Sequence, residues 1–67
     1  MLKIESEREE DGRWIAEVPA LPGVLSYGAN ELEARAKAQA LALRVIAGRL
    51  DHGEPLPREI AAVFAAA

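Results

Sequence analysis

Few side chains in this sequence could act as a nucleophile or a general base. The chain has no cysteine, one histidine (His52) and two serines, Ser6 and Ser26. Serine catalysis needs a hydroxyl next to a base, on an exposed turn with oxyanion donors beside it. Neither serine has such a sequence around it, and His52 lies near the expected end of a helix, where an imidazolium complements the dipole. The sequence therefore predicts no catalytic residues.

Carboxylates are the other candidates for chemistry. Five acidic residues fall within the first twelve positions: Glu5, Glu7, Glu9, Glu10 and Asp11. They alternate along a strand or lie in a turn, and no helical Glu-x-x-His motif or acidic quartet that could hold a metal is present. Glycine-rich phosphate-binding motifs are absent as well. We expect no metal, no cofactor and no enzymatic activity, which leaves binding as the default function.

The net charge of −3 lies entirely at the N-terminal end, because residues 13–67 hold six acids and six bases. A localised acidic edge repels phosphate backbones and attracts basic partners. We therefore expect no direct nucleic-acid binding. Two interpretations of the acidic segment stay open: a solvated edge that avoids pairing with other sheets, or a toxin-binding surface formed by Glu7, Glu9, Glu10 and Asp11.

Sixty-seven residues, 51% of them apolar, suit one small domain over residues 1–67. A chain of this size buries only about 60% of its unfolded surface, and it has no cysteine for a disulfide. Self-association, as a dimer or tetramer, is the remaining way to gain stability. Met1 leads directly into a charged stretch, and no apolar run approaches the roughly 20 residues of a membrane span. These features predict a soluble cytoplasmic protein with no membrane contact.

Alternating apolar and polar residues predict strands over 2–7 and 13–18, joined by a hairpin at Asp11-Gly12, where both residues tolerate positive φ. Trp14 is expected to be buried and to anchor the inner face of the sheet. Pro22-Gly23 fits a type II turn before a third strand over 24–27.

A helix is expected to begin at Glu31 and to end near Leu50 or Asp51. Asn30 suits the N-cap, and Glu33 could reach back to the Asn30 N–H in a capping box. Gly53 offers the C-terminal stop, and the prolines at positions 55 and 57 prevent continuation.

Apolar residues occupy two opposite sides of this helix. One side carries Leu32, Ala36, Ala40, Leu43, Ala47 and Leu50, flanked by Ile46; the other carries Ala34, Ala38, Leu41 and Val45. A surface helix of a monomer needs one apolar stripe. The second stripe is either an oligomer or partner interface or a consequence of alanine's helix propensity.

Residues 60–65 alternate in a way that predicts a fourth strand, although their alanines also suit a short helix. A strand after the long helix would lie parallel to an earlier strand. The expected fold is α+β with topology β-β-β-α-β: a small, mainly antiparallel sheet with one long helix packed on one face.

The segment from Glu17 to Gly28, with Asn30 and Glu33-Ala34 after it, resembles the signature of the HicB-like antitoxin family. The residues that carry the resemblance are Pro19, Leu21, Pro22, Gly23 and Gly28, followed by the helix cap. Three positions depart from the family pattern: Ala20 replaces Asp, Val24 replaces Cys, and Asn30 replaces a chemically equivalent Thr.

The resemblance implies a partial ribonuclease-H-like fold without nuclease carboxylates, in a protein that neutralises a small basic HicA-type toxin that cleaves mRNA. It also implies a short form, because the C-terminal DNA-binding domain of many family members has no counterpart here. Family packing favours Ala34, Ala38, Leu41 and Val45 as the inner helix face, which leaves Leu32, Ala36, Leu43 and Leu50 as the oligomer interface. Side-chain bulk alone favours the reverse.

Two functions follow as hypotheses. The first is an antitoxin-like protein that occludes the RNA-binding surface of its toxin partner. The alternative is a stand-alone homo-oligomeric module that binds another protein or a ligand and has no toxin partner.

Overall fold

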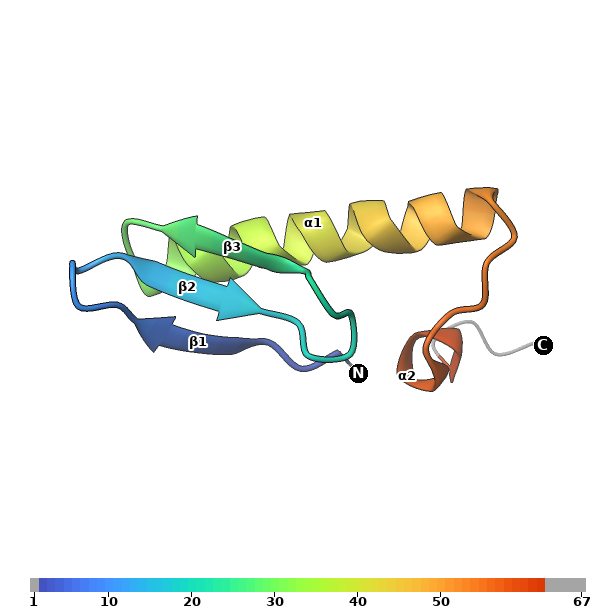
Figure 1. Ribbon diagram of the computed structural model, residues 1–67, viewed down its shortest axis with the longest axis horizontal. Helices are drawn as coiled ribbons and strands as arrows, with labels where there is room; N and C mark the ends of the chain where they lie inside the picture. Colours follow the sequence, from blue (N-terminus) through green and yellow to red (C-terminus); the bar gives the residue numbers. More distant parts are fainter. Residues whose placement is uncertain (1, 63–67) are drawn as a thin grey trace.

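Three short strands and one long helix make up most of residues 2–62, the part of the chain that the computed structural model describes (Figure 1). The elements are β1 (Glu5–Arg8), β2 (Trp14–Glu17), β3 (Leu25–Gly28), α1 (Glu31–Asp51) and α2 (Arg58–Ala61). The strands form one antiparallel sheet in the order β1-β2-β3, and α1 packs across one face of it. This arrangement confirms the α+β class, a small antiparallel sheet with one long helix.

Strand register gives the two faces of the sheet different side chains. One cross-strand row consists of Ser6, Ala16 and Ser26, which face α1. Because side chains alternate along a strand, the neighbouring residues of each strand point to the opposite face. The small residues of the inner row allow the helix to approach the strands closely.

The β1–β2 turn is held by a hydrogen bond from Gly12 N–H to Glu9 O (3.0 Å) and by one from Glu9 N–H to Arg13 O (2.7 Å). The hairpin forms at Asp11-Gly12 as predicted, and Gly12 takes the positive φ, +90°, while Asp11 does not. A turn followed by a left-handed glycine is a common three-residue hairpin loop.

The β2–β3 connection has the turn that the sequence predicts. Val24 N–H donates to Leu21 O (3.0 Å), and Gly23 takes φ +88° at the third position of this four-residue turn, as type II geometry requires. Val18 N–H also donates to Val24 O. The chain therefore enters β3 directly, with Leu21 pointing into the core at 0% exposure.

Both ends of α1 are capped by the expected residues. Asn30 Oδ1 accepts a hydrogen bond from Glu33 N–H (2.8 Å), but Glu33 Oε1 accepts from Ala29 N–H (3.1 Å) and not from Asn30 as predicted. At the other end Gly53 has φ +69°, and its N–H donates to Leu50 O while Glu54 N–H donates to Arg49 O. These two bonds are a Schellman motif.

Alanines line the side of α1 that faces the sheet. The buried residues of the helix are Ala34, Ala38, Ala42 and Ile46, with Leu41 and Val45 half-buried beside them. The alanine-rich face is thus the inner one, as the family pattern favoured. Two assignments were wrong or missing: Ile46 lies in the core and not beside the Leu32 stripe, and Ala42 was not assigned to either face. The contact follows every fourth residue, a ridge of the helix surface.

The tightest approach of helix and sheet is at Gly28. A Cβ at this position would lie 2.5 Å from Ala34 N and 2.9 Å from Ala34 Cα. Trp14 is the cross-strand partner of Gly28. Trp14 lies on the inner face and packs against the core, as expected, but it is half-buried at the border of the core and not fully buried.

The expected fourth strand is also wrong for the residues that the structure describes. Ile60 and Ala61 belong to α2, and their N–H groups both donate to Pro57 O (3.0 Å). In so short a segment, alternation of Ile with Ala cannot distinguish the two periods, and alanine favours the helix. Ile60 belongs to the core cluster. Positions 63–65 of the predicted strand lie outside the described residues.

Candidate protein-binding surfaces

The face of the sheet opposite α1 has no element of residues 2–62 packed over it. Its two cross-strand rows are Glu5, Glu17 and Leu25, and Glu7, Ile15 and Tyr27. These six residues, with Glu9 at the end of β1, are here called the outer sheet face. It combines an apolar strip on β2 and β3 with carboxylates along β1 and the end of β2.

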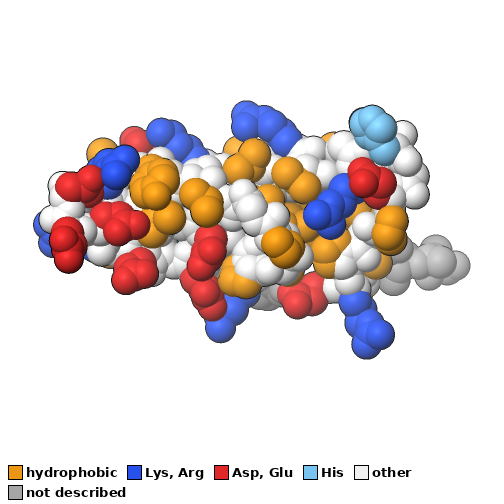
Figure 2. All heavy atoms as spheres, in the orientation of Figure 1, with side chains coloured by type: hydrophobic (Ala, Val, Ile, Leu, Met, Phe, Trp, Pro, Cys, Tyr) orange, Lys and Arg blue, Asp and Glu red, His pale blue; other side chains and the backbone are white. Residues whose placement is uncertain are grey.

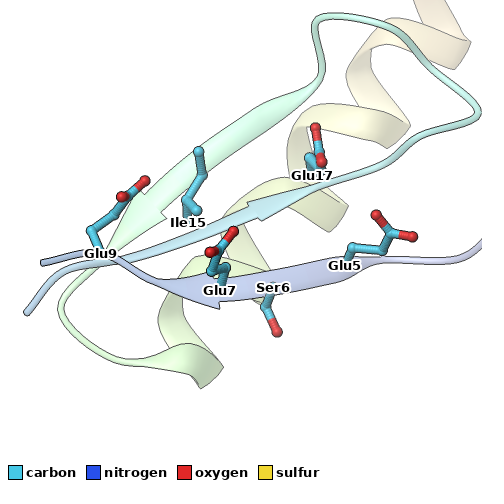
Figure 3. Close-up of a pocket in the computed structure, with 6 residues that line it drawn as sticks. All are labelled: Glu5, Ser6, Glu7, Glu9, Ile15 and Glu17. Carbon is cyan, nitrogen blue, oxygen red and sulfur yellow. The ribbon is translucent and has the colours of Figure 1, made fainter.

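Figure 3 shows how the carboxylates lie around the apolar centre. Glu5, Glu7, Glu9 and Glu17 line a hollow together with Ile15. The side chains of Glu7, Glu17 and Ile15 rise from the same side of the strands, whereas Ser6 points away from them. A second hollow, lined by Glu7, Glu9, Glu10, Asp11 and Tyr27 among others, continues this surface to the hairpin. Figure 2 shows the acidic side chains gathered at this end of the molecule, next to an apolar patch.

Like charges lie directly opposite each other on this face. Glu5 and Glu17 are cross-strand partners, an arrangement that destabilises a sheet by about 0.2–1 kcal/mol. Departures from the usual stabilising patterns tend to occur at functional sites. The pair makes the outer sheet face a candidate binding surface.

The hairpin beside this face has a defined conformation. Asp11 accepts hydrogen bonds from Arg13 N–H (3.0 Å) and Arg13 Nε (2.8 Å). These bonds, the backbone bond first, lower the pKa of Asp11 below its usual value. The Arg13 guanidinium lies 4.7 Å from the centre of the Tyr27 ring, in a cation–π contact. Arg13 thereby connects the turn to β3.

The four predicted toxin-binding acids therefore have different positions. Glu7 and Glu9 contribute to both hollows, whereas Glu10 and Asp11 line only the hollow at the turn, and Asp11 is engaged with Arg13. Sequence analysis missed Glu5 and Glu17 as members of this group. Their alternation with inward residues was visible, but only the strand register shows that they face each other.

The solvent side of α1 is the second candidate surface. Leu32, Leu43 and Leu50 are exposed by 81%, 61% and 53%, and Ala36 is exposed as well. These are the residues predicted for an oligomer interface. Leu43 also borders an apolar hollow between α1 and the start of the chain, lined by Leu2, Ile4, Val18, Gln39, Ala42 and Leu43.

The residues that carry the family resemblance have structural positions. Leu21 lies in the core, and Pro22 and Gly23 form the type II turn. Gly28 permits the contact with Ala34, and Pro19 is exposed beside the turn. This motif shapes the β2–β3–α1 connection.

Two side chains that could act as a nucleophile or base, Ser6 and His52, make local contacts. Ser6 Oγ contacts a carboxylate oxygen of Glu31 and accepts from Arg35 Nη1 (3.1 Å). His52 Nδ1 lies 2.8 Å from Gly48 O at the end of α1. Within residues 2–62, no three His, Cys, Asp or Glu side chains are placed to hold a metal ion.

Neither helix in the described part of the chain is long and apolar enough to cross a membrane. Comparisons of the sequence and structure with protein-family models, curated proteins and solved structures found no match. The two surfaces are therefore interpreted from their own chemistry and from the motif noted in the sequence.

Proposed function

We propose that this protein is an antitoxin-like binding protein of the cytoplasm, without enzymatic activity, that neutralises a small basic mRNA-cleaving partner of the HicA type. Neutralisation occurs by occlusion: the protein covers the basic surface with which the partner binds RNA. The HicB-like classification and the partial ribonuclease-H-like fold are part of the same proposal.

The open acidic surface is the observation that carries this proposal. Glu5, Glu7, Glu9 and Glu17 line a hollow with the half-buried Ile15, and exposed Leu25 and Tyr27 lie beside it on a sheet face that no described element covers. A ribonuclease must attract phosphates with cationic side chains, so an acidic surface complements it in charge. The Pro-x-Leu-Pro-Gly motif, whose residues shape the β2–β3–α1 connection, adds the resemblance to HicB-like antitoxins.

The exposed leucines of α1 favour a second candidate function. Leu32, Leu43 and Leu50 lie on one side of the helix, where a dimer or tetramer of this chain could bury them. The protein would then be a homo-oligomeric module that binds another protein or a ligand and has no toxin partner. Antitoxin activity and self-association are compatible, because the two surfaces lie on different layers of the molecule.

Co-expression tests the proposal directly. The tagged chain is expressed with the small protein encoded beside its gene, the complex is purified, and RNA cleavage by that protein is measured alone and in the complex. We expect a stoichiometric complex in which cleavage is suppressed. A neighbour that cleaves RNA but forms no complex would exclude the antitoxin function, and a stable homo-oligomer in the same preparation would favour the alternative.

A further inference from the structure

We propose that the basic partner docks on the outer sheet face, with Ile15, Leu25 and Tyr27 as its apolar contacts and Glu5, Glu7, Glu9 and Glu17 as the acidic border. This inference rests on the proposed function and adds the surface and the chemistry of the contact. The occupant is a basic protein that presents Arg or Lys side chains beside an apolar contact.

The apolar strip has the composition of an interface centre. Leu25 and Tyr27 are exposed by 39% and 42%, and Ile15 lies between Glu7 and Tyr27 in the same cross-strand row. Tyrosine is enriched at binding hot spots because it combines a large apolar area with a polar hydroxyl. The strip lies on strands, so its side chains are already held in place before binding.

Charge identifies the occupant as a basic protein and not a second copy of this chain. In a twofold pair each copy would add the same four carboxylates to one shared interface. The basic side chains near this face are Lys3, which is exposed before β1, Arg8, which lines the hollow at the hairpin, and Arg13, which already bonds Asp11 and contacts Tyr27. Like charges brought together across an interface disfavour that pairing.

A cationic partner would also relieve a repulsion that exists in the free protein. Glu5 and Glu17 lie directly opposite each other, and Glu7 and Glu9 line the same hollow. An Arg or Lys placed between such carboxylates gains favourable contacts and removes the like-charge cost. The fold maintains the repulsion in the absence of a partner, which is the arrangement expected of a surface prepared for a cation.

The solvent side of α1 is less suited to this partner. Its exposed leucines stand among charged residues of both signs: Lys37 is paired with Glu33, and Arg35 and Arg44 are exposed. A basic protein would meet no excess of negative charge there. The two surfaces therefore make opposite predictions about which variants weaken binding.

Matched variants of the full chain test this assignment in complex with the neighbouring protein. Leu25→Thr removes an apolar contact from the strip and keeps a strand-favouring residue, and Leu43→Gln is the matched change on α1. We expect Leu25→Thr to weaken binding about tenfold or more and Leu43→Gln by less than about twofold. The reverse order would overturn the docking surface and leave the proposed function intact.

Two variants that each remove one carboxylate give an independent comparison. Glu17→Gln removes a carboxylate from the hollow, and Glu54→Gln does the same in the exposed loop after α1. We expect Glu17→Gln to slow association at low salt about threefold to tenfold, with the difference shrinking at high salt, and Glu54→Gln to have no effect. Circular dichroism and thermal unfolding of each variant exclude misfolding as the cause of weaker binding.

A synthetic probe tests the surface without the neighbouring protein. The ¹⁵N-labelled chain is titrated with a capped hexapeptide that alternates arginine and leucine, with a hexapeptide of alternating glutamate and leucine as the control. We expect chemical-shift changes in β1, β2 and β3 with the basic peptide only, and their loss in the Leu25→Thr variant. Changes confined to α1, or no saturable change, would overturn the inference.

The binding measurements with the neighbouring protein and the peptide titration together distinguish a wrong docking surface from a wrong proposed function. A basic peptide that binds the outer sheet face, together with a neighbour that does not, would support the surface and exclude the toxin as its occupant. A complex with the neighbour that depends on Leu43 and not on Leu25 would support the antitoxin function and exclude this surface.

Discussion

The two faces of the sheet are made by alternating residues of the same strands, yet they differ in the size and charge of the side chains that they carry. The inner face has a row of small side chains, Ser6, Ala16 and Ser26, beneath an alanine-lined helix, with Trp14 half-buried at its border. The outer face has large and charged side chains that contact little else in residues 2–62. Packing determines which side chains fit on the inner face, because a close-packed core has no space for an added methyl group. The outer face places two like charges, Glu5 and Glu17, opposite each other, which packing does not require and which the proposed binding of a basic partner would explain.

Leucine truncation gives the largest expected contrast between the faces. Leu21→Ala empties a fully buried position, and we expect a loss of about 2–5 kcal/mol in the free energy of unfolding. A domain of this size has a total stability of only about 3–10 kcal/mol, so the variant should be partly unfolded at 37 °C. Leu25→Ala on the outer face should cost about 1 kcal/mol or less. Urea unfolding followed by circular dichroism measures both, and equal losses would contradict the division between the faces.

A methyl group at Gly28 should have the next largest effect. Gly28→Ala forces a Cβ against the backbone of Ala34, and backbone atoms cannot move aside as a flexible side chain can. We expect a loss of about 2 kcal/mol or more, at the upper part of the range for overpacked cores. Gly48→Ala is the control: Gly48 lies in the last turn of α1, and a Cβ there meets no atom within 4 Å outside the neighbouring helix backbone, so it should gain up to about 0.5–1 kcal/mol. A neutral Gly28→Ala would mean that α1 can slide away from the sheet.

The helix cap should have an intermediate effect, because it fixes where α1 starts and therefore where Ala34 meets Gly28. Asn30→Ala removes the acceptor for Glu33 N–H and should cost about 1 kcal/mol. Asn30→Ser retains an acceptor and should remain within a few tenths of a kcal/mol of the original chain. Thermal unfolding of the two variants decides whether the hydrogen bond or only the residue's size matters.

Neutralising one carboxylate of the outer face should have a small effect of the opposite sign. Glu17→Gln removes the like charge opposite Glu5, and we expect a gain of about 0.2–1 kcal/mol at low ionic strength. Salt screens the repulsion, so the gain should disappear near 1 M salt, where the Debye length is about 3 Å. A variant that is less stable than the original chain would show that Glu17 has a structural role.

Local chemistry made much of this fold predictable. The turn at Pro22-Gly23, the cap at Asn30 and the helix stop at Gly53 depend on a few adjacent residues, and each formed as expected. The misassigned residues depend on distances between elements. Trp14 packs at the border of the core and is only half-buried, and Ile60 belongs to a helix because six residues do not define a period.

The candidate site was predictable only in part for a related reason. Glu7 and Glu9 were recognisable from local charge, whereas Glu17 joined them through strand pairing. Ile15 and Tyr27 were not among the candidate site residues, because each stands beside polar residues in the sequence. Their register brings them side by side, and a sequence shows such a patch only after the pairing is known.

Acid should weaken the hairpin and the start of α1 by the smallest and most local amounts, because Asp11 and Glu33 are exposed. The Ala29 N–H, and then Lys37, lower the pKa of Glu33 from its usual 4.5, as Arg13 lowers that of Asp11 from 3.8. A carboxyl group whose pKa is lower in the folded state stabilises the fold above its unfolded pKa, and that contribution is lost as pH falls through the folded value. We therefore expect constant stability near neutral pH and a decline that begins between about pH 5 and pH 4. The Glu33→Gln variant has no carboxyl group to titrate at the start of α1, so its free energy of unfolding should be lower at neutral pH and should decline less in acid. The Asp11→Asn variant should reduce only the part of the acid-induced decline that comes from the hairpin. Urea midpoints measured from pH 7 to pH 3 separate these contributions, and identical curves for all three chains would show that neither carboxyl group is linked to folding.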